Sequence, residues 1–539
     1  MSRRRKAPTK TELLQLQKLY KTDEKIGERL GGVPAYLVAY WRRKKNIPKH
    51  SLPKFSELEV RNLWERYGDD EKAGLELGLS KAAFYNWRRR YGIKEKPAFL
   101  KLEQLEFNFP GAKTTGAANN LYGKQTMAQK IITRVLRKEK DHVEVGEEVL
   151  IEPDLVVTHD DSGRIAELFK KASVEYVWNP NKIAVTFDED NAHRHGSETG
   201  AALREFLKRQ RIKNIYDLRE GLGHQAIMEK GLILPGQMAV ATDDSIAAYG
   251  SVGALSSEIT PEEAVHVWSS GKLKLTVPGT IKLSITGRRG RAVSARDILL
   301  AVVRKLSRIG ANGKVIEYGG SIMPQLTMSE RFTLAGLSSD LGACGAICPY
   351  DASTRRYLTG RNVQSYRPVI PDKNAEYSEM YQISIDQLTP QIDCPGDEVT
   401  IKTAQEMEGT PVQLILLGSL SNGRFDDLRV AADILKGKQV HSDCRLLIVP
   451  ASRSVYLEAL KKGLIRVFLE AGAVLLGTGN FGPSVISGLS SGDKCLATAG
   501  TSLRRGCPGY ESQIYLCSPA TAAASALHAS ITDPARFLR

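Results

Sequence analysis

The first 100 residues of this chain contain a segment that occurs twice. Residues 22–31 read TDEKIGERLG and match residues 69–78, which read DDEKAGLELG. Residues 40–47 (YWRRKKNI) likewise match residues 86–93 (NWRRRYGI). Duplication at a spacing of a few tens of residues indicates two copies of one small folding unit. We therefore predict two modules, residues 1–50 and 51–98, in place of one larger N-terminal domain.

Each copy has the pattern of three short helices. The first is expected at residues 12–20 and 57–67, and a short second helix ends at a Gly turn. The third begins near Pro34 in the first copy and after Ser80 in the second. Pro suits the first turn of a helix, and Ser is a good N-cap. This order of elements is typical of a helix-turn-helix, whose last helix enters the major groove of DNA.

Basic residues concentrate in this region. Residues 1–100 carry 24 Lys and Arg against 12 Asp and Glu, whereas the other 439 residues carry 52 against 49. A basic region on a nearly neutral body predicts an acidic polymer as partner. We predict double-stranded DNA, bound by Arg42, Arg43, Lys44, Lys81, Tyr85, Asn86, Arg88, Arg89 and Arg90, with further base contacts from Ala35, Tyr36, Val38, Ala39 and Ala82. Binding of RNA, docking to a protein, and two modules whose charge only solvates them are the alternatives.

The composition excludes a membrane protein. Hydrophobic residues make up 42% of the chain and charged residues 25%, and no apolar run approaches the roughly 20 residues that a membrane helix needs. No apolar signal core follows the basic N-terminus. The seven cysteines include no CxxC pair and are expected to be reduced thiols. A cytoplasmic protein without a membrane partner is the resulting prediction.

The pattern changes after a stretch rich in small residues. Residues 99–122 are predicted to be a linker, and residues 123–539 a separate body. Apolar runs such as residues 413–417 (QLILL) and 446–449 (LLIV) are bounded by Gly or Pro and followed by helical patterns. Such runs are typical of buried parallel strands, so the body is predicted to be α/β.

Three stretches of the body are distinctive: residues 123–132 (GKQTMAQKII), 450–456 (PASRSVY) and 518–525 (SPATAAAS). They resemble the aconitase superfamily, and most closely the large subunits of isopropylmalate dehydratase and homoaconitase. The resemblance implies an aconitase-like three-lobed α/β/α body, preceded in this chain by a small all-α tandem helix-turn-helix head. It also implies hydro-lyase (carbon–oxygen lyase) chemistry, a di- or tricarboxylate ligand and a separate small subunit as partner.

Three positions depart from the family's cysteine motifs. Where the family reads GSCTNG and CGPC, residues 418–423 read GSLSNG and residues 481–484 read FGPS. Leu420, Phe481 and Ser484 thus replace the cysteines that hold the family's iron–sulfur cluster, which needs thiolate ligands. We therefore predict that the cluster is absent and that no cofactor is bound. A divalent metal near Glu189, Asp190, His193, His195, Asp244 and Asp340 is a minor alternative.

The resemblance also assigns candidate site residues. The candidate catalytic residues are His224, Asp243, Asp188 and Asp340, and the His of Gly223-His224-Gln225 is expected to pair with Asp243. The candidate substrate-binding residues are Ser421, Asn422, Arg424, Asp244 and Arg505. The structural alternative is a buried His–Asp pair that only satisfies the core, beside a turn at Asn422-Gly423.

Other family positions have changed, and this decides the leading hypothesis. The family's TDSHT reads TDDSI at residues 242–246. The Asn and Glu of the family's NMxxExGA helix become Gly336 and Asp340. An expected Asn-Arg-Asn triplet reads Gly500-Thr501-Ser502, with Arg504 and Arg505 nearby. Losing one preorganised donor typically costs roughly 3 kcal/mol of transition-state stabilisation. The leading hypothesis is a cluster-less, DNA-binding pseudoenzyme that acts as a regulator or sensor. The alternative is a hydro-lyase large subunit that acts with a separate small subunit.

Overall fold

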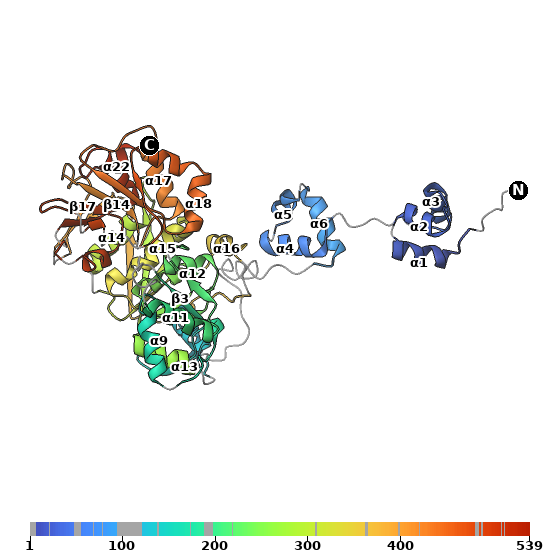
Figure 1. Cartoon of the computed structure of the whole chain (residues 1–539), viewed down its shortest axis with the longest axis horizontal. Helices are drawn as coiled ribbons and strands as arrows, with labels where there is room; N and C mark the ends of the chain where they lie inside the picture. Colours follow the sequence, from blue (N-terminus) through green and yellow to red (C-terminus); the bar gives the residue numbers. More distant parts are fainter. Residues whose placement is uncertain are drawn as a thin grey trace. The chain divides into compact units, whose positions relative to one another are not determined.

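The chain divides into two compact units, Met1–Ala117 and Ala118–Arg539 (Figure 1). The computed structural model describes residues 7–20, 22–47, 55–67, 69–77, 79–93, 121–136, 140–172, 174–187, 198–217, 219–307, 310–361, 365–396, 399–419, 421–479, 485–486, 489–507, 509–510 and 513–538. Most of the predicted linker, residues 99–120, lies outside these ranges, so the domain boundaries remain predictions. None of the helices in the described part of the chain has both the length and the apolar composition to span a bilayer.

The first unit contains two three-helix modules. The first comprises α1 (Lys10–Tyr20), α2 (Asp23–Arg29) and α3 (Ala35–Lys44), and the second α4 (Glu57–Tyr67), α5 (Asp70–Glu76) and α6 (Lys81–Arg90). Ser80 caps α6 by accepting a hydrogen bond from the Ala83 amide. The repeated glycine has a steric reason, because a Cβ on Gly27 would lie 2.0 Å from the Val33 carbonyl oxygen. Each module has its own small apolar core.

Both modules are closed by the same arginine clasp. Arg42 donates from Nε and Nη2 to the Asp23 carboxylate, at 3.0 Å each, and from Nη1 to the Ile47 carbonyl at 3.0 Å. Arg88 repeats the arrangement with Asp70 and the Ile93 carbonyl, at 2.8 to 2.9 Å. A paired, bidentate guanidinium ties the end of the third helix to the start of the second. The first Arg of each Trp-Arg-Arg therefore holds its module together.

The second unit begins with a five-stranded parallel sheet. Its order is β4-β3-β2-β5-β6, formed by Asn214–Tyr216, Ile183–Thr186, Leu155–Thr158, Met238–Ala241 and Leu255–Glu258. The helices of this part are α8 (Met127–Arg134), α9 (Ser162–Lys171), α11 (Glu198–Arg209), α12 (Gly223–Glu229) and α13 (Pro261–Ser270). The strands β1 (Glu148–Ile151) and β7 (Leu273–Thr276), distant in the chain, form a separate antiparallel two-stranded sheet. Separate apolar clusters use alternate residues of β2, β3 and β5, so both faces of the sheet are covered.

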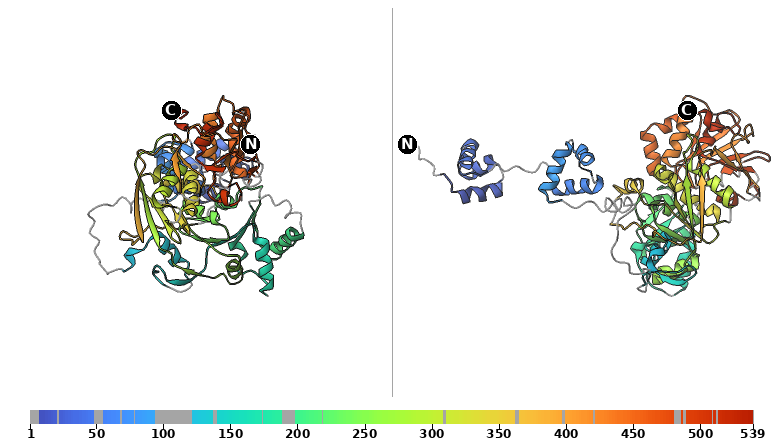
Figure 2. Two further views of the ribbon diagram at one scale, coloured as in Figure 1. Left: turned by 90° about the vertical axis from the view of Figure 1, so that its left-hand side faces the viewer. Right: turned by 180° about the vertical axis from the view of Figure 1, so that it is seen from behind.

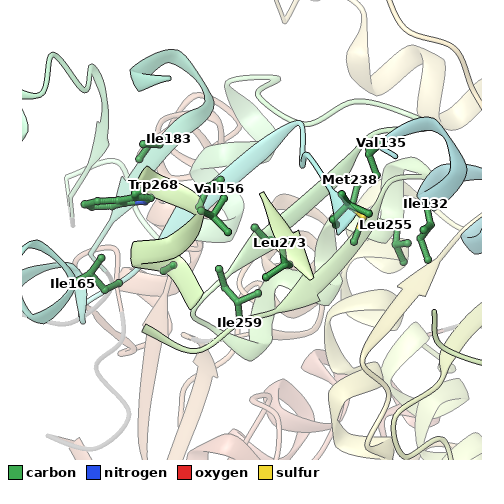
Figure 3. Packing of buried hydrophobic residues seen from close by; sticks show 14 of the residues in the cluster. Ile132, Val135, Val156, Ile165, Ile183, Met238, Leu255, Ile259, Trp268 and Leu273 are labelled. Carbon is green, nitrogen blue, oxygen red and sulfur yellow. The ribbon is translucent and has the colours of Figure 1, made fainter. Parts of the chain in front are cut away.

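Figure 3 shows one of these cores from close by. Trp268 of α13, Ile165 of α9 and Ile183 of β3 belong to it, together with Val156 and Leu273. The Trp268 ring stacks on the ring of Phe206, with centroids 6.1 Å apart. Burial of these large side chains, each worth about 1.5–3 kcal/mol, holds the helices on the sheet.

Two further sheets complete the unit. One has the order β10-β9-β8-β11 and is parallel, with strands Gly345–Ile347, Val315–Gly319, Thr280–Thr286 and Glu379–Ser384. The other has the order β13-β12-β18-β17-β14-β15-β16, with strands Ile401–Thr403, Gln391–Asp393, Ile514–Leu516, Cys495–Ala497, Leu414–Gly418, Arg445–Val449 and Val474–Leu475. In the latter sheet only β12 pairs antiparallel.

Helices flank these sheets, as Figures 1 and 2 show. They are α14 (Ala295–Leu306), α15 (Met328–Gly336), α16 (Ala352–Leu358), α17 (Phe425–Leu435), α18 (Arg453–Lys461), α19 (Leu464–Glu470), α21 (Ser502–Arg505) and α22 (Pro519–Ala526), with short 3₁₀ turns η1 (Leu121–Lys124), η2 (Pro180–Lys182), η3 (Asp244–Val252), η4 (Met323–Gln325), η5 (Leu337–Leu341) and η7 (Pro534–Arg536). The predicted α/β class is confirmed. The apolar runs at residues 413–417 and 446–449 form β14 and β15, the adjacent parallel strands expected of them.

The clasp predicts different roles for two neighbouring arginines. In the full chain, Arg88→Ala should destabilise the second module, because breaking a buried pair costs about 3–5 kcal/mol. Amide exchange in α4, α5 and α6 should then rise by about 100-fold or more. Arg89→Ala, at an exposed position, is the matched control and should leave exchange unchanged. Equal exchange in the two variants would contradict the clasp.

A second prediction concerns Glu317 of β9. This buried carboxyl accepts hydrogen bonds from the Ala128 amide at 2.9 Å and the Tyr377 hydroxyl at 3.1 Å, and burial raises its pKa to about 7. The folded state thus holds a proton that the unfolded state loses earlier, so this contribution to stability falls as pH rises from about 4.5 through 7. Glu317→Gln should raise the melting temperature at pH 8 but not at pH 4.5. A variant that melts lower at both pH values would contradict this.

Candidate active site

The turn between β14 and α17 forms the centre of the site. It follows a central strand of a parallel sheet at its carboxyl end, where ligands of α/β proteins bind. Gly423 has φ 86°, and a Cβ there would lie 2.2 Å from the Val449 carbonyl oxygen. The tight turn buries Asn422 to 1% exposure, and Ser421 is half-buried. Both candidate substrate residues therefore lie where the fold offers a ligand position.

Arg424 connects this turn to two other segments. Its Nε donates to Gln225 Oε1 of α12 at 2.9 Å, and its Nη1 donates to the Ser421 carbonyl at 2.7 Å and to Thr333 Oγ1 of α15 at 3.3 Å. Burial lowers the pKa of Arg424. The guanidinium also lies over the Phe332 ring, 4.9 Å from its centroid. These contacts identify Arg424 as the residue that positions the turn.

Gln225 extends the network to a buried acid. Its Nε2 donates to Glu229 Oε1 at 2.8 Å, and Ser452 Oγ donates to the same oxygen at 2.7 Å. Burial raises the pKa of Glu229 above its usual range. Sequence reasoning quoted Gln225 only as part of a motif and missed Glu229, which falls four residues beyond that motif.

A second group surrounds Asp243, the N-cap of η3. The Asp243 carboxylate lies 3.7 Å from His159 Nε2, and His159 Nδ1 lies 3.2 Å from Asp160. Burial opposes ionisation of Asp243, but the charges of His159 and His224 and the hydrogen bonds from Ser245 outweigh it, so that its pKa is lowered. The structure therefore brings His224 and Asp243 into one electrostatic cluster. Sequence reasoning missed His159, although His159-Asp160-Asp161 directly follows the buried strand β2.

Asp340 and Arg505 meet at Thr501. The Asp340 carboxylate accepts from the Thr501 amide at 3.1 Å and from Thr501 Oγ1 at 2.5 Å, and Arg505 Nη1 donates to Thr501 Oγ1 at 3.4 Å. Arg504 is not available to a ligand in this arrangement. It is buried and donates to the Ile514 carbonyl at 2.9 Å and the Asp393 carbonyl at 2.8 Å.

Two cavities open beside the turn. One, of about 610 Å³, is lined by Gln225, Glu229, Arg356, Arg361 and Arg424 among others. The other, of about 220 Å³, is lined by Asn422, Thr333 and Arg296 among others. Both therefore border on residues of the Arg424 network.

Some predicted positions cannot be placed. Asp188 lies outside the described residues, and only the backbone of Asp244 is described. The three positions matched to cluster cysteines also lie outside the described ranges, and so does most of the alternative metal set. These residues are Leu420, Phe481, Ser484, Glu189, Asp190, His193 and His195.

Comparison with known proteins identifies the family of this chain. The model of the aconitase family (aconitate hydratase) matches residues 129–529. The chain belongs to the aconitase family. It is 36% identical to the 3-isopropylmalate dehydratase large subunit 1 of Methanopyrus kandleri over 422 residues, which cover 77% of this chain and 100% of that subunit. It is also 36% identical to a probable methanogen homoaconitase large subunit of Methanosarcina mazei, over 72% of this chain and 100% of that one.

A distant resemblance to a solved structure accompanies these. The aconitase X of Thermococcus kodakaraensis aligns with a TM-score of 0.40 and 13% identity, over 66% of this chain and 84% of that one.

These relatives correct the leading hypothesis. Aconitase-family membership over three quarters of the chain, with relatives named as dehydratase subunits, supports the hydro-lyase alternative and not a DNA-binding pseudoenzyme regulator. The structure gives a physical reason for part of the error. Arg42 and Arg88, predicted to contact DNA, are used in internal clasps, and Val38 is fully buried. The helix-turn-helix assignment of the head is likewise unsupported. Of the other predicted contacts, Ala35 and Ala39 are half-buried, and the exposed ones are Tyr36, Arg43, Lys44, Lys81, Ala82, Tyr85, Asn86, Arg89 and Arg90.

The prediction of a cluster-free protein is also contradicted by this membership, because the family ordinarily holds an iron–sulfur cluster. That prediction depended on three residues that the structure does not describe. Within the described ranges, no three His, Cys, Asp or Glu side chains are arranged to hold a metal ion. Burial raises the pKa of Cys344 to about 11 and those of Cys348 and Cys444 to about 12. The described residues therefore do not form a ligand set for the cluster, and no reaction step is assigned to it.

Proposed function

We propose that this chain is the large subunit of a hydro-lyase of the isopropylmalate dehydratase and homoaconitase type. It would act with a separate small subunit on a hydroxy-di- or tricarboxylate. The observation that carries the proposal is the match at 36% identity to the whole length of a dehydratase large subunit. A cytoplasmic location agrees with the seven cysteines, all of which are free thiols.

The site supports the proton chemistry of such a reaction. Dehydration removes a proton from a carbon beside a carboxylate and releases the hydroxyl group as water. Because the pKa of Asp243 is lowered, its carboxylate is ionised at neutral pH and can hold a neighbouring imidazole in one tautomer. His224 and His159 are the imidazoles within its electrostatic reach. We assign to this group the storage and transfer of the proton.

The turn and the network around it support substrate orientation. Asn422 and Ser421 lie at the strand end, and Arg424 fixes the turn from inside through Gln225 and Thr333. Arg424 is thereby a positioning residue, whereas Asn422 is the candidate for direct contact. Asp340 acts through Thr501 and positions the segment that carries Arg505.

The proposal is tested by reconstitution. We expect the full chain, produced without oxygen together with the small subunit of an isopropylmalate dehydratase, to dehydrate 3-isopropylmalate or a related hydroxy acid, measured as absorbance of the unsaturated product. Asp243→Asn should lower kcat by about 10²–10⁴-fold, the usual contribution of general acid–base catalysis. Glu262→Gln, on an exposed ion pair with Arg164, is the control and should retain activity. Complex formation without turnover of any hydroxy acid would contradict the proposal.

A further inference from the structure

The cavity of about 610 Å³ beside the turn is a second place where a ligand can bind. Helices α12, α15, α16, α17 and α18 all contribute to its lining. Of the reaction residues that the structure describes, the following do not line it: His159, His224, Asp243, Asn422 and Arg505. Its volume falls in the range of roughly 300–1,000 Å³ that is usual for small-molecule sites. The cavity is therefore distinct from the site of the reaction.

One face of α16 supplies the polar groups of one wall. Ser353, Arg356 and Tyr357 stand at positions i, i+3 and i+4, which share a face of a helix, and all three line the cavity. Arg361, four residues further along the chain, lines it too. Arg356 is exposed, and its side chain has no hydrogen bond or ion pair to any residue that the structure describes. This wall thus presents a guanidinium that the described part of the protein does not use.

An aromatic ring holds the second guanidinium of this wall. Arg361 lies over the ring of Tyr357, 3.9 Å from its centroid, and its Nη1 donates to the Tyr357 carbonyl. Arg361 has no ion pair within the described ranges. Stacking occupies the face of a guanidinium and leaves its edge for hydrogen bonds. Arg424 also lines the cavity, but its Nε and Nη1 donate to Gln225, Thr333 and the turn, so it fixes the wall.

The acids of the lining compensate these charges only in part. Glu229 accepts two hydrogen bonds inside the protein, at 2.7 and 2.8 Å, and Asp426 pairs with Arg429 at 3.0 Å. Glu458, exposed on α18, is the remaining acid of the described lining. Against it stand the two guanidiniums of the α16 wall. The cavity therefore carries an excess of uncompensated positive charge among the described residues, which favours an anion.

The rest of the lining suits an organic group. Pro324 is exposed, and Tyr357 and Phe425 are half-buried, so each retains apolar surface at the cavity. A bare inorganic ion would leave that surface in water, whereas a ligand with an apolar part would cover it. Ser353 and Ser454 also line the cavity, and a hydroxyl can donate to an oxygen of an anion. The lining thus combines donors for an anion with a surface for a hydrocarbon group.

We propose that this cavity binds a small organic anion, a carboxylate or phosphate monoester with an apolar group, through Arg356 and Arg361. The planar fork of a guanidinium matches the oxygens of either anion. The apolar group lies against Tyr357 and Phe425. The site is independent of the proposed dehydration, because the residues that bind this anion differ from those assigned to the reaction.

The test is calorimetric titration of the full chain, without a small subunit, with phenyl phosphate, benzoate and inorganic phosphate. At least one organic probe should bind about tenfold or more tightly than inorganic phosphate, because only the organic probes cover the apolar lining. Arg356→Met should weaken that binding by about 10–100-fold, the usual value of charge-assisted hydrogen bonds. Arg453→Met, exposed beside Ser454 but outside the lining, is the matched control and should leave the affinity unchanged.

Glu458→Gln tests the sign of the ligand's charge. Removing this acid should strengthen binding of the organic anion by about two- to fivefold, because it removes a repulsion. Since Arg356 and Glu458 are exposed, both variants should melt at the temperature of the unmodified chain. Four results would each overturn the assignment: binding of no probe, unchanged affinity in Arg356→Met, weaker binding in Glu458→Gln, or displacement of the organic probe by 3-isopropylmalate. None of these readouts requires turnover, so failure of the proposed function is seen separately.

Discussion

The hydrogen bonds of Arg424 are the constraint on which the rest of the site depends. One guanidinium contacts α12, α15 and its own turn, so it joins segments that lie up to 199 positions apart in the chain. The second unit has separate apolar cores around its three main sheets. Those cores stabilise the sheets, and one of them also joins Val315 of β9 and Ile347 of β10 to the five-stranded sheet. At the site, the buried Arg424 adds hydrogen bonds between three segments, because moving any partner would leave a buried charged donor without its acceptor.

Buried arginines show how the same side chain serves different purposes in this protein. Arg42 and Arg88 close two small modules, and Arg331 and Arg504 tie loops to helices by carbonyl contacts. Each has at least three hydrogen bonds to the protein, although Nε of Arg331 has no partner in the described part of the chain. Arg296 is as deeply buried, and none of its guanidinium nitrogens has a hydrogen-bond partner among the described residues. Desolvating a guanidinium is costly, which is why the other buried arginines are matched by acceptors in the protein.

The sequence supported the family and the α/β class because the residues behind both predictions are determined by their position in a motif or a buried strand. The runs at 413–417 and 446–449 are apolar on both faces because β14 and β15 are buried on both faces. The prediction of DNA contacts in the head relied on a count of basic residues, and such a count does not show which of them are paired inside the protein. Arg88 and Arg89 are adjacent and chemically identical, yet one is bonded to Asp70 and the other is exposed. Nothing local distinguishes them.

The sequence alone therefore determined the family, the strand runs and the motif positions His224, Asp243 and Asn422, since each depends on residue type at a given place in the chain. Only the tertiary structure decided that His159 approaches Asp243, that Arg424 is engaged inside the protein and that Arg356 shares a cavity with Glu458. These relations join residues 84, 199 and 102 positions apart. Contacts at such separations depend on how the sheets pack, and residue type does not encode that packing position by position.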